Sequence, residues 1–191
     1  YLIMQHEMKR LLVLIAFAAV CAVIFAQRTE RLLRDWHFSQ GASEMVNSET
    51  GWRPVRVPHD WAITGPFSRD NDLQRVQVTQ NNETTASEKT GRTGGLPYEG
   101  VGWYRTTFDA DTAGTLVFDG AMSEARVYLN GEEICFWPYG YNSFYCDATP
   151  YLRGNGRGNR LVVRLENRPQ SSRWYCGAGL YRNVHLIHTN K

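Results

Sequence analysis

The chain has 191 residues, of which 42% are hydrophobic and 21% are charged. This composition is typical of a globular protein and excludes a wholly disordered chain. Its 21 Lys and Arg residues nearly balance 19 Asp and Glu residues, giving a formal charge of +2. Nucleic-acid-binding proteins carry a clear basic surplus, so the charge does not indicate binding to DNA or RNA. The length suffices for one domain but not for a domain plus a catalytic barrel of roughly 250 residues.

The first part of the chain has the pattern of an export signal. An apolar run at 11–26 follows two basic residues and ends on a small residue, as secretory signals do. We therefore predict a signal peptide at 1–26, with 1–7 upstream of the true start, and a periplasmic or extracellular domain at 27–191. Acylation of Cys21 as a lipoprotein and an uncleaved anchor are open alternatives. The run is shorter than the about 20 residues of a stable membrane span.

A polar segment lies near the middle of the chain. Residues 68–96 contain a run of Asn, Glu and Thr followed by several glycines. Such a segment offers too little apolar surface to pack, so we predict a long surface loop between two groups of strands.

The remaining chain after residue 53 has the periodicity of β-strands. Short β-branched and aromatic runs predict strands at 102–109, 116–118, 126–129, 134–136, 160–166 and 181–188. Asn130-Gly131 separates two of these runs and favours a type I′ hairpin turn. No stretch after residue 26 keeps a helical period over three turns. These features predict an all-β, antiparallel sandwich.

Three cysteines follow the predicted signal peptide: Cys135, Cys146 and Cys176. An exported protein can form disulfides, and an odd number leaves at least one thiol free. Cys135 and Cys146 are close in sequence on adjoining segments and form the pair to test. Three unpaired thiols that fill small core spaces are the alternative. No spacing of Cys and His indicates zinc, and we predict neither a metal site nor a cofactor.

Four segments together carry a resemblance to a known family. They are 52–61 (WRPVRVPHDW), 94–97 (GGLP) leading into 102–105 (GWYR), 127–131 (VYLNG) leading into 138–141 (PYGY), and 172–184 (SRWYCGAGLYRNV). In this order and spacing, the chain from about Leu33 to His188 resembles the amino-terminal sugar-binding domain of glycoside hydrolase family 2. It is most similar to β-galactosidases of the exported bacterial type.

The resemblance implies a jelly-roll β-sandwich that is galactose-binding-domain-like. In the full family this domain is followed by an immunoglobulin-like domain and by a barrel with two catalytic glutamates. A retaining glycosidase needs two carboxylates roughly 5 Å apart, and no family catalytic motif occurs in this chain. The resemblance therefore implies a fragment of a β-galactosidase-like hydrolase that lacks the barrel and is not catalytic alone. The implied partners are those missing domains and a β-galactoside-like carbohydrate.

The resemblance also implies where a site would lie, because the family segment that matches 171–179 reaches toward the barrel mouth. The implied residues at a sugar-binding site or its edge are Ser172, Arg173, Trp174 and Tyr175. Those implied at an interdomain seam are Gly177, Gly179, Tyr181 and Arg182.

Two of these side chains suit sugar binding on chemical grounds. The Arg173 guanidinium offers a planar set of donors for hydroxyls or a carboxylate, and the Trp174 ring offers a flat apolar face. Other family members carry an aspartate in this region, whereas this chain has Ser172-Arg173, so the resemblance implies the location of the site more directly than the specific contact. An ion pair for Arg173 and simple packing for Trp174 are the alternatives.

Other residues of catalytic type have simpler interpretations. His59 and Asp60 belong to acid and base residue types, but we expect them to fix the turn after Pro58, with Trp61 buried. Asp60, Asp147 and Glu166 are expected to hydrogen-bond turns and strand ends. The two tyrosines of the motif 138–141 could stack on a sugar ring, yet we expect this motif to pack within the sandwich.

Two functions from other classes compete with an accessory domain of an enzyme. One is a free-standing carbohydrate-binding module, which needs a concave groove with several polar groups. The other is a structural or adhesive sandwich, which does not need the Arg-Trp-Tyr cluster in register with the other three segments. An accessory domain should instead keep an apolar, glycine-rich surface around 172–181 for its partner domain.

Overall fold

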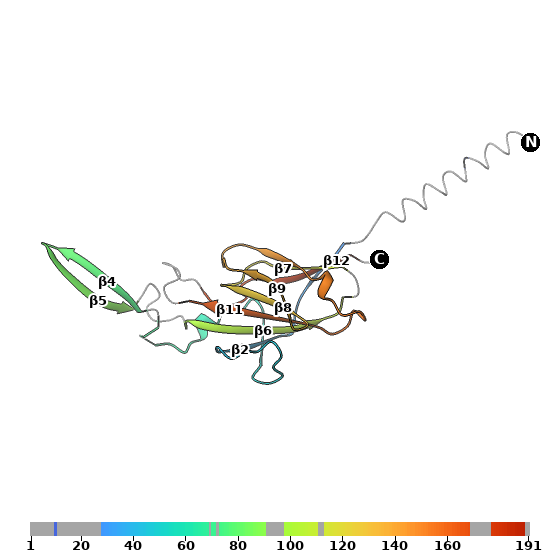
Figure 1. The fold of residues 1–191 in the computed structure, drawn as a ribbon, viewed down its shortest axis with the longest axis horizontal. Helices are drawn as coiled ribbons and strands as arrows, with labels where there is room; N and C mark the ends of the chain where they lie inside the picture. The colour runs from blue at the N-terminus through green and yellow to red at the C-terminus, as the bar shows by residue number, and fades with distance from the viewer. Residues whose placement is uncertain are drawn as a thin grey trace, which may run out of the picture.

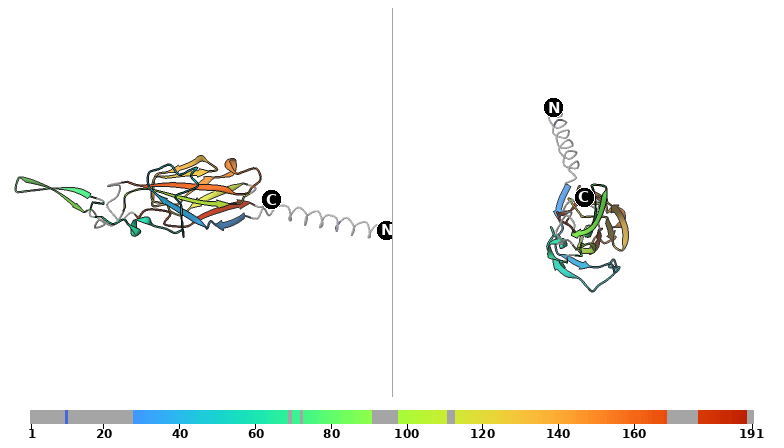
Figure 2. Two further views of the ribbon diagram at one scale, coloured as in Figure 1. Left: turned by 90° about the horizontal axis from the view of Figure 1, so that it is seen from below. Right: turned by 90° about the vertical axis from the view of Figure 1, so that its left-hand side faces the viewer.

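The protein folds into a β-sandwich from which one hairpin projects. The computed structural model describes Arg10 and residues 28–68, 70–71, 73–90, 98–110, 113–168 and 177–189. Apart from Arg10, the predicted signal segment lies outside the described residues. The hairpin leaves one end of the sandwich, whereas β1 begins and β12 ends at the opposite end (Figures 1 and 2).

One layer is a four-stranded antiparallel sheet. In spatial order its strands are β1 (Arg28–Leu32), β12 (Val184–Thr189), β7 (Gly114–Phe118) and β10 (Phe144–Asp147). Alternate side chains of β7 and β10 are buried, so this sheet turns one face to the core and the other to solvent.

The second layer is a six-stranded antiparallel sheet. Its strands in spatial order are β3 (Arg53–Val55), β2 (Trp36–Gln40), β6 (Gly100–Phe108), β11 (Asn159–Asn167), β8 (Ala125–Leu129) and β9 (Glu132–Trp137). Two short 3₁₀ helices lie in the connections, η1 (Trp61–Thr64) and η2 (Thr149–Tyr151). The all-β sandwich predicted from the sequence is confirmed.

The strongest local signals in the sequence are borne out by the structure. Asn130 and Gly131 form the turn between β8 and β9, and both have positive φ, 54° and 96°. Leu161, Val163 and Leu165 point inward from β11 and are fully buried. The last strand starts at Val184 rather than at residue 181, because the chain bends at Arg182 before it joins the sheet.

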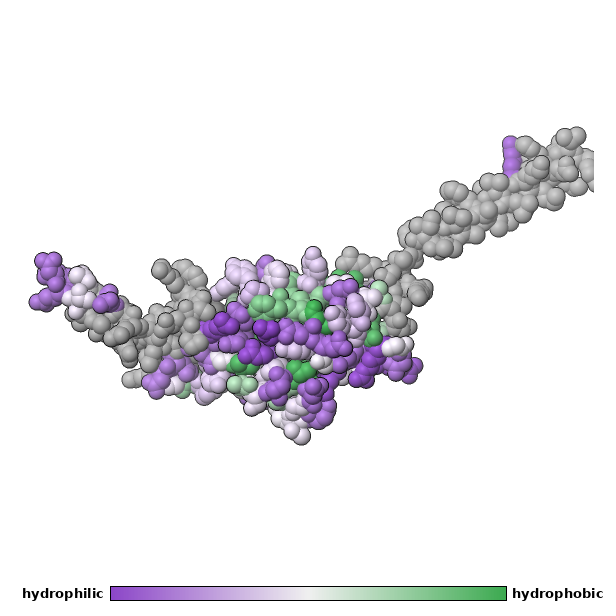
Figure 3. Space-filling view, viewed as in Figure 1, coloured by the Kyte–Doolittle hydropathy of each residue, from purple (hydrophilic) through white to green (hydrophobic). Residues whose placement is uncertain are grey.

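The polar segment 68–96 is not simply a loop, which corrects the prediction. It contains β4 (Leu73–Gln80) and β5 (Glu83–Thr90), which pair with each other in a sheet of their own. Asn81 and Asn82 take positive φ values of 54° and 67°, as a two-residue hairpin turn requires. Two Asn residues tolerate this conformation almost as glycine does. The exposed tip of the hairpin is hydrophilic (Figure 3).

The core between the two sheets is rich in aromatic side chains. Phe38, Trp61 and Tyr104 are fully buried, and the rings of Phe38 and Trp61 stack with centroids 5.5 Å apart. On the opposing sheet, Phe118 stacks on Phe144 at 4.7 Å. Burying side chains of this size contributes a few kcal/mol each and defines how the layers pack.

A second, smaller cluster covers the outer face of the six-stranded sheet. Met45 and Val46 pack on Trp103 and Val162, which therefore are buried although they face away from the main core. This covering explains why Val162, which alternates along β11 with the inward-facing Leu161 and Val163, is only 1% exposed. The segment that contains Met45 and Val46 is also held by hydrogen bonds, because the Ser48 carbonyl accepts from Arg105 and Arg160 of the sheet.

Three further features concern the described part of the chain alone. None of its helices is long and apolar enough to cross a membrane. No group of three or more His, Cys, Asp or Glu side chains within the described ranges could hold a metal ion. Cys135 and Cys146 are free thiols, and Cys176 lies outside the described residues.

Candidate functional site

The structure describes part of the predicted site. Ser172, Arg173, Trp174 and Tyr175 lie outside the described residues, as does the GGLP motif at 94–97. Gly177, Gly179, Tyr181 and Arg182 are described and lead into β12. The contacts of these four residues therefore show how the end of the predicted site segment is held within the domain.

Residues 177–180 are held between two other segments of the domain. On one side His59 donates its backbone N–H to the Leu180 carbonyl (2.7 Å), and Trp61 donates to the Ala178 carbonyl (2.8 Å). On the other side Gly179 and Met122 exchange two backbone hydrogen bonds of 2.9 and 3.0 Å. The backbone that follows the predicted sugar-binding residues is thus fixed within the domain.

Asp60 organises this junction through one carboxylate oxygen. Its Oδ1 accepts from the backbone N–H of Ala62 (2.9 Å), which caps η1, and from that of Ala178 (2.8 Å). A carboxylate at a helix N-terminus that also binds a neighbouring segment has a structural task. The expectation that Asp60 fixes the turn, with Trp61 buried beside it, is confirmed.

His59 is hydrogen-bonded to a buried phenol. Its Nδ1 lies 2.7 Å from the Tyr104 hydroxyl, and its ring packs against Phe38 with centroids 5.0 Å apart. Burial lowers the pKa of His59, as does the positive charge of Arg53. Burial also raises the pKa of Tyr104 above its ordinary value. Both shifts favour the neutral forms at pH 7, and the hydrogen bond between the two side chains links the turn at His59 to β6.

Gly179 allows a close approach inside the domain. With φ at +134°, it has no room for a side chain, since a Cβ would overlap the His59 carbonyl oxygen and the Tyr104 hydroxyl. Glycine is the residue that tolerates both conditions. Contact between this segment and a further domain is still a prediction.

The motif at 138–141 is exposed, which corrects the expectation that it packs within the sandwich. Tyr139 and Tyr141 are 57% and 46% exposed, and their ring centroids lie 5.5 Å apart. Only Gly140 between them is buried, because its backbone lies against Met122 too closely for any side chain. The close approach at Gly140 leaves the two flanking rings on the surface.

Tyr181 connects this motif to the predicted seam. Its hydroxyl donates to the Gly140 carbonyl at 2.7 Å, and partial burial raises its pKa. The exposed Arg182 lies over the Tyr181 ring, with its guanidinium carbon 5.4 Å from the centroid. We call Tyr139, Tyr141, Tyr181 and Arg182 the tyrosine surface. Apolar ring faces beside a guanidinium can contact a sugar or another protein domain.

The remaining carboxylates named from the sequence have structural partners. Asp147 accepts the backbone N–H of Thr149 at 2.9 Å, and hydrogen bonds from Thr149 lower the pKa of its carboxyl. Glu166 forms ion pairs with Arg164 (2.9 Å) and Arg168 (3.4 Å). These contacts confirm the expected roles at turns and strand ends.

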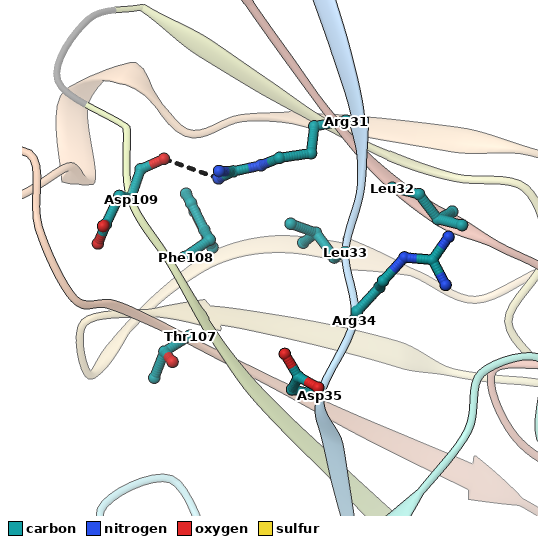
Figure 4. A pocket seen from close by; sticks show the side chains of 8 residues that line it. All are labelled: Arg31, Leu32, Leu33, Arg34, Asp35, Thr107, Phe108 and Asp109. Carbon is teal, nitrogen blue, oxygen red and sulfur yellow. Dashed lines mark hydrogen bonds between the residues drawn. The ribbon is translucent and has the colours of Figure 1, made fainter.

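A cavity of about 380 Å³ lies at the other end of the sandwich. Figure 4 shows its lining from β1 and the end of β6, where Arg31 donates to the Asp109 carbonyl at 2.7 Å. The opposite end of β6 packs against Trp61 through Gly102. Six residues of strand, about 20 Å, separate the two places. The cavity is therefore remote from the junction at 59–61.

No family model matches the chain. Comparison with individual proteins, however, finds glycosidases both by sequence and by structure. The β-galactosidase BoGH2A of Bacteroides ovatus is 39% identical over 165 residues, which is 81% of this chain and 17% of that protein. A glycosyl hydrolase family 2 member from Bacteroides cellulosilyticus superposes with a TM-score of 0.68 at 30% identity, covering 84% of this chain and 20% of the other.

A third relative agrees with these two. A β-glycosidase from Bacteroides vulgatus superposes with a TM-score of 0.67 at 27% identity, covering 85% of this chain and 20% of the other. The chain thus spans about a fifth or less of the length of each of these relatives. The chain belongs to glycosyl hydrolase family 2, where it corresponds to the amino-terminal domain.

Proposed function

We propose that this chain is the accessory domain of an exported β-galactosidase-like enzyme and acts together with a catalytic domain supplied by further sequence. It binds that domain, and the edge of its carbohydrate substrate, through the tyrosine surface and residues 172–175. The exposed tyrosine pair on a fixed backbone carries this proposal. Aromatic rings held on an anchored loop lose little entropy when a partner covers them.

The junction at 59–61 supports the same interpretation. Its histidine and carboxylate are occupied by Tyr104, Ala62 and Ala178, so they stabilise the segment that leads into the tyrosine surface. His59 and Asp60, although of residue types common in catalysis, here position the tyrosine surface. Export is supported by the sequence pattern at 1–26.

A chimeric enzyme tests the proposal. The region of BoGH2A that matches this chain is replaced by the chain, and hydrolysis of a nitrophenyl galactoside is measured. We expect the chimera to retain activity and the double variant Tyr139→Ala/Tyr141→Ala to lose at least about tenfold in kcat/KM, equal to 1.4 kcal/mol. Tyr145→Ala is the matched control, because Tyr145 is 76% exposed on a strand outside the tyrosine surface.

The outcomes separate the alternatives. Equal activity of the double variant and the Tyr145→Ala control would contradict a role for the tyrosine surface. The same exposed ring pair also suits a free-standing carbohydrate-binding module. Calorimetric titration of the isolated chain with galactose-containing oligosaccharides distinguishes this function, since an accessory domain binds them weakly without its partner.

A further inference from the structure

Cys135 and Cys146 face each other across the interior of the sandwich. Cys135 lies on β9 opposite Val127, and Cys146 lies on β10 opposite Leu116. Val127 and Leu116 are fully buried residues of the two inner faces. The two cysteines therefore extend from different sheets toward the same core.

The neighbouring inner positions are in contact and fix how the two strands align. Trp137, two residues after Cys135, stacks on Phe144, two residues before Cys146, with centroids 5.7 Å apart and planes inclined by 13°. Because side chains on one face recur every second residue, the next inner pair is Cys135 and Cys146. Both thiols are free, and the interaction between their side chains shifts the pKa of each, as expected of neighbouring groups.

We propose that Cys135 and Cys146 form a disulfide that joins the two sheets and closes the loop carrying Tyr139 and Tyr141. The loop between the two cysteines holds the exposed ring pair, so the bond restrains the surface that the proposed function uses. The inference itself rests on the pairing geometry and does not depend on that function.

The two thiols differ in a way that suits stepwise oxidation. Cys135 is half-buried and can be reached by an oxidant, whereas Cys146 is 3% exposed. Interaction with the Cys146 side chain lowers the pKa of Cys135, whereas interaction with Cys135, together with burial, raises the pKa of Cys146. The thiolate, which is the attacking species, therefore forms first at the accessible cysteine.

The reaction uses a small-molecule or protein disulfide as oxidant. The Cys135 thiolate attacks one sulfur of that disulfide, a mixed disulfide forms, and the first thiolate leaves. Cys146 then loses its proton and attacks Cys135 Sγ, which releases the second thiolate. Two cysteine thiols are oxidised to one disulfide, and the oxidant is reduced to two thiols.

Oxidised glutathione serves as the probe in the test. The full chain is incubated with it, free thiols are alkylated, and the digested protein is analysed by mass spectrometry. We expect a cross-linked peptide pair that contains Cys135 and Cys146. The variant Cys21→Ser/Cys176→Ser, which keeps only the proposed pair, should give the same product. Its Tm should rise by about 5 °C on oxidation, and Cys135→Ser should abolish both the cross-link and this rise.

Other results would overturn the inference. Alkylation of both Cys135 and Cys146 after oxidation would show that they do not pair. A cross-link from either residue to Cys21 or Cys176 would show a different pairing. An oxidised protein with an unchanged or lower Tm would contradict a bond that fits the folded structure.

Discussion

This domain contains one group of aromatic residues that is buried in the core and another that is exposed on the surface. Phe38, Trp61 and Tyr104 are fully buried, and they hold the turn at His59. Tyr139 and Tyr141 are about half exposed, although their loop is anchored through Gly140 and Tyr181. Burial of the first group stabilises the fold, whereas the second group leaves apolar area for a partner. Residue type alone does not separate structural from functional aromatic residues; burial and anchoring do.

The largest expected effect comes from the buried group. Trp61→Ala should lower the free energy of unfolding by about 4 kcal/mol, because it removes a large side chain from a packed core. Tyr139→Ala is the matched control and should cost less than about 1 kcal/mol. Urea denaturation of both variants checks the contrast, which fails if the two losses are similar.

A smaller effect is expected at Asp60, whose carboxylate caps the 3₁₀ helix that begins at Trp61. Asp60→Ala removes the acceptor for the backbone N–H groups of Ala62 and Ala178 and should cost about 2 kcal/mol. Asp60→Asn retains an oxygen that can accept both hydrogen bonds, so its loss should be smaller. Equal losses for the two variants would argue that the charge of Asp60, rather than its hydrogen bonds, stabilises the turn.

The pH dependence of stability should report on His59. Its pKa is lowered in the folded state by burial and by Arg53, so the unfolded chain, with an ordinary pKa near 6.5, binds the proton more readily. Stability from this residue is therefore present above about pH 6.5 and is lost as the pH falls below this value and through the lowered pKa of the folded state. The urea midpoint should drop over that interval, and His59→Gln should drop less. An identical drop in the variant would remove His59 as the cause.

The smallest effect is expected at a residue of the proposed partner surface. Trp174→Ala should change the melting of the isolated chain very little, because we assign Trp174 to a contact with another domain. Thermal unfolding of the variant checks this. A loss above about 3 kcal/mol would place Trp174 in the core.

Much of the fold could be predicted where local chemistry decides it. Asn130-Gly131 has a strong turn preference, and β11 alternates apolar side chains, so both elements are where the sequence indicates. The β4–β5 hairpin was missed because its strands are polar and its turn is Asn81-Asn82 rather than Asn-Gly. β1 and β3 show no apolar alternation in the sequence, and they are completed by pairing with β12 and β2. β2 does alternate, with Trp36 and Phe38 buried, but it is only five residues long.

The site was less predictable than the fold. The role of Asp60 in a turn was anticipated, but its bond to Ala178 joins residues 118 positions apart and has no local signal. The exposure of Tyr139 and Tyr141 also depends on distant residues, because Met122 and Tyr181 fix Gly140. The glycine between two tyrosines was the available signal, and its interpretation required knowing which side of the loop meets the core.

The most direct test of the account is the hydrolytic activity of the chain alone. The purified protein is incubated with nitrophenyl β-galactoside and nitrophenyl β-glucuronide, and nitrophenol release is followed. An accessory domain predicts release no faster than in buffer. Turnover at ordinary enzyme rates, roughly 1–1000 per second, would contradict the account and require a catalytic centre within these residues.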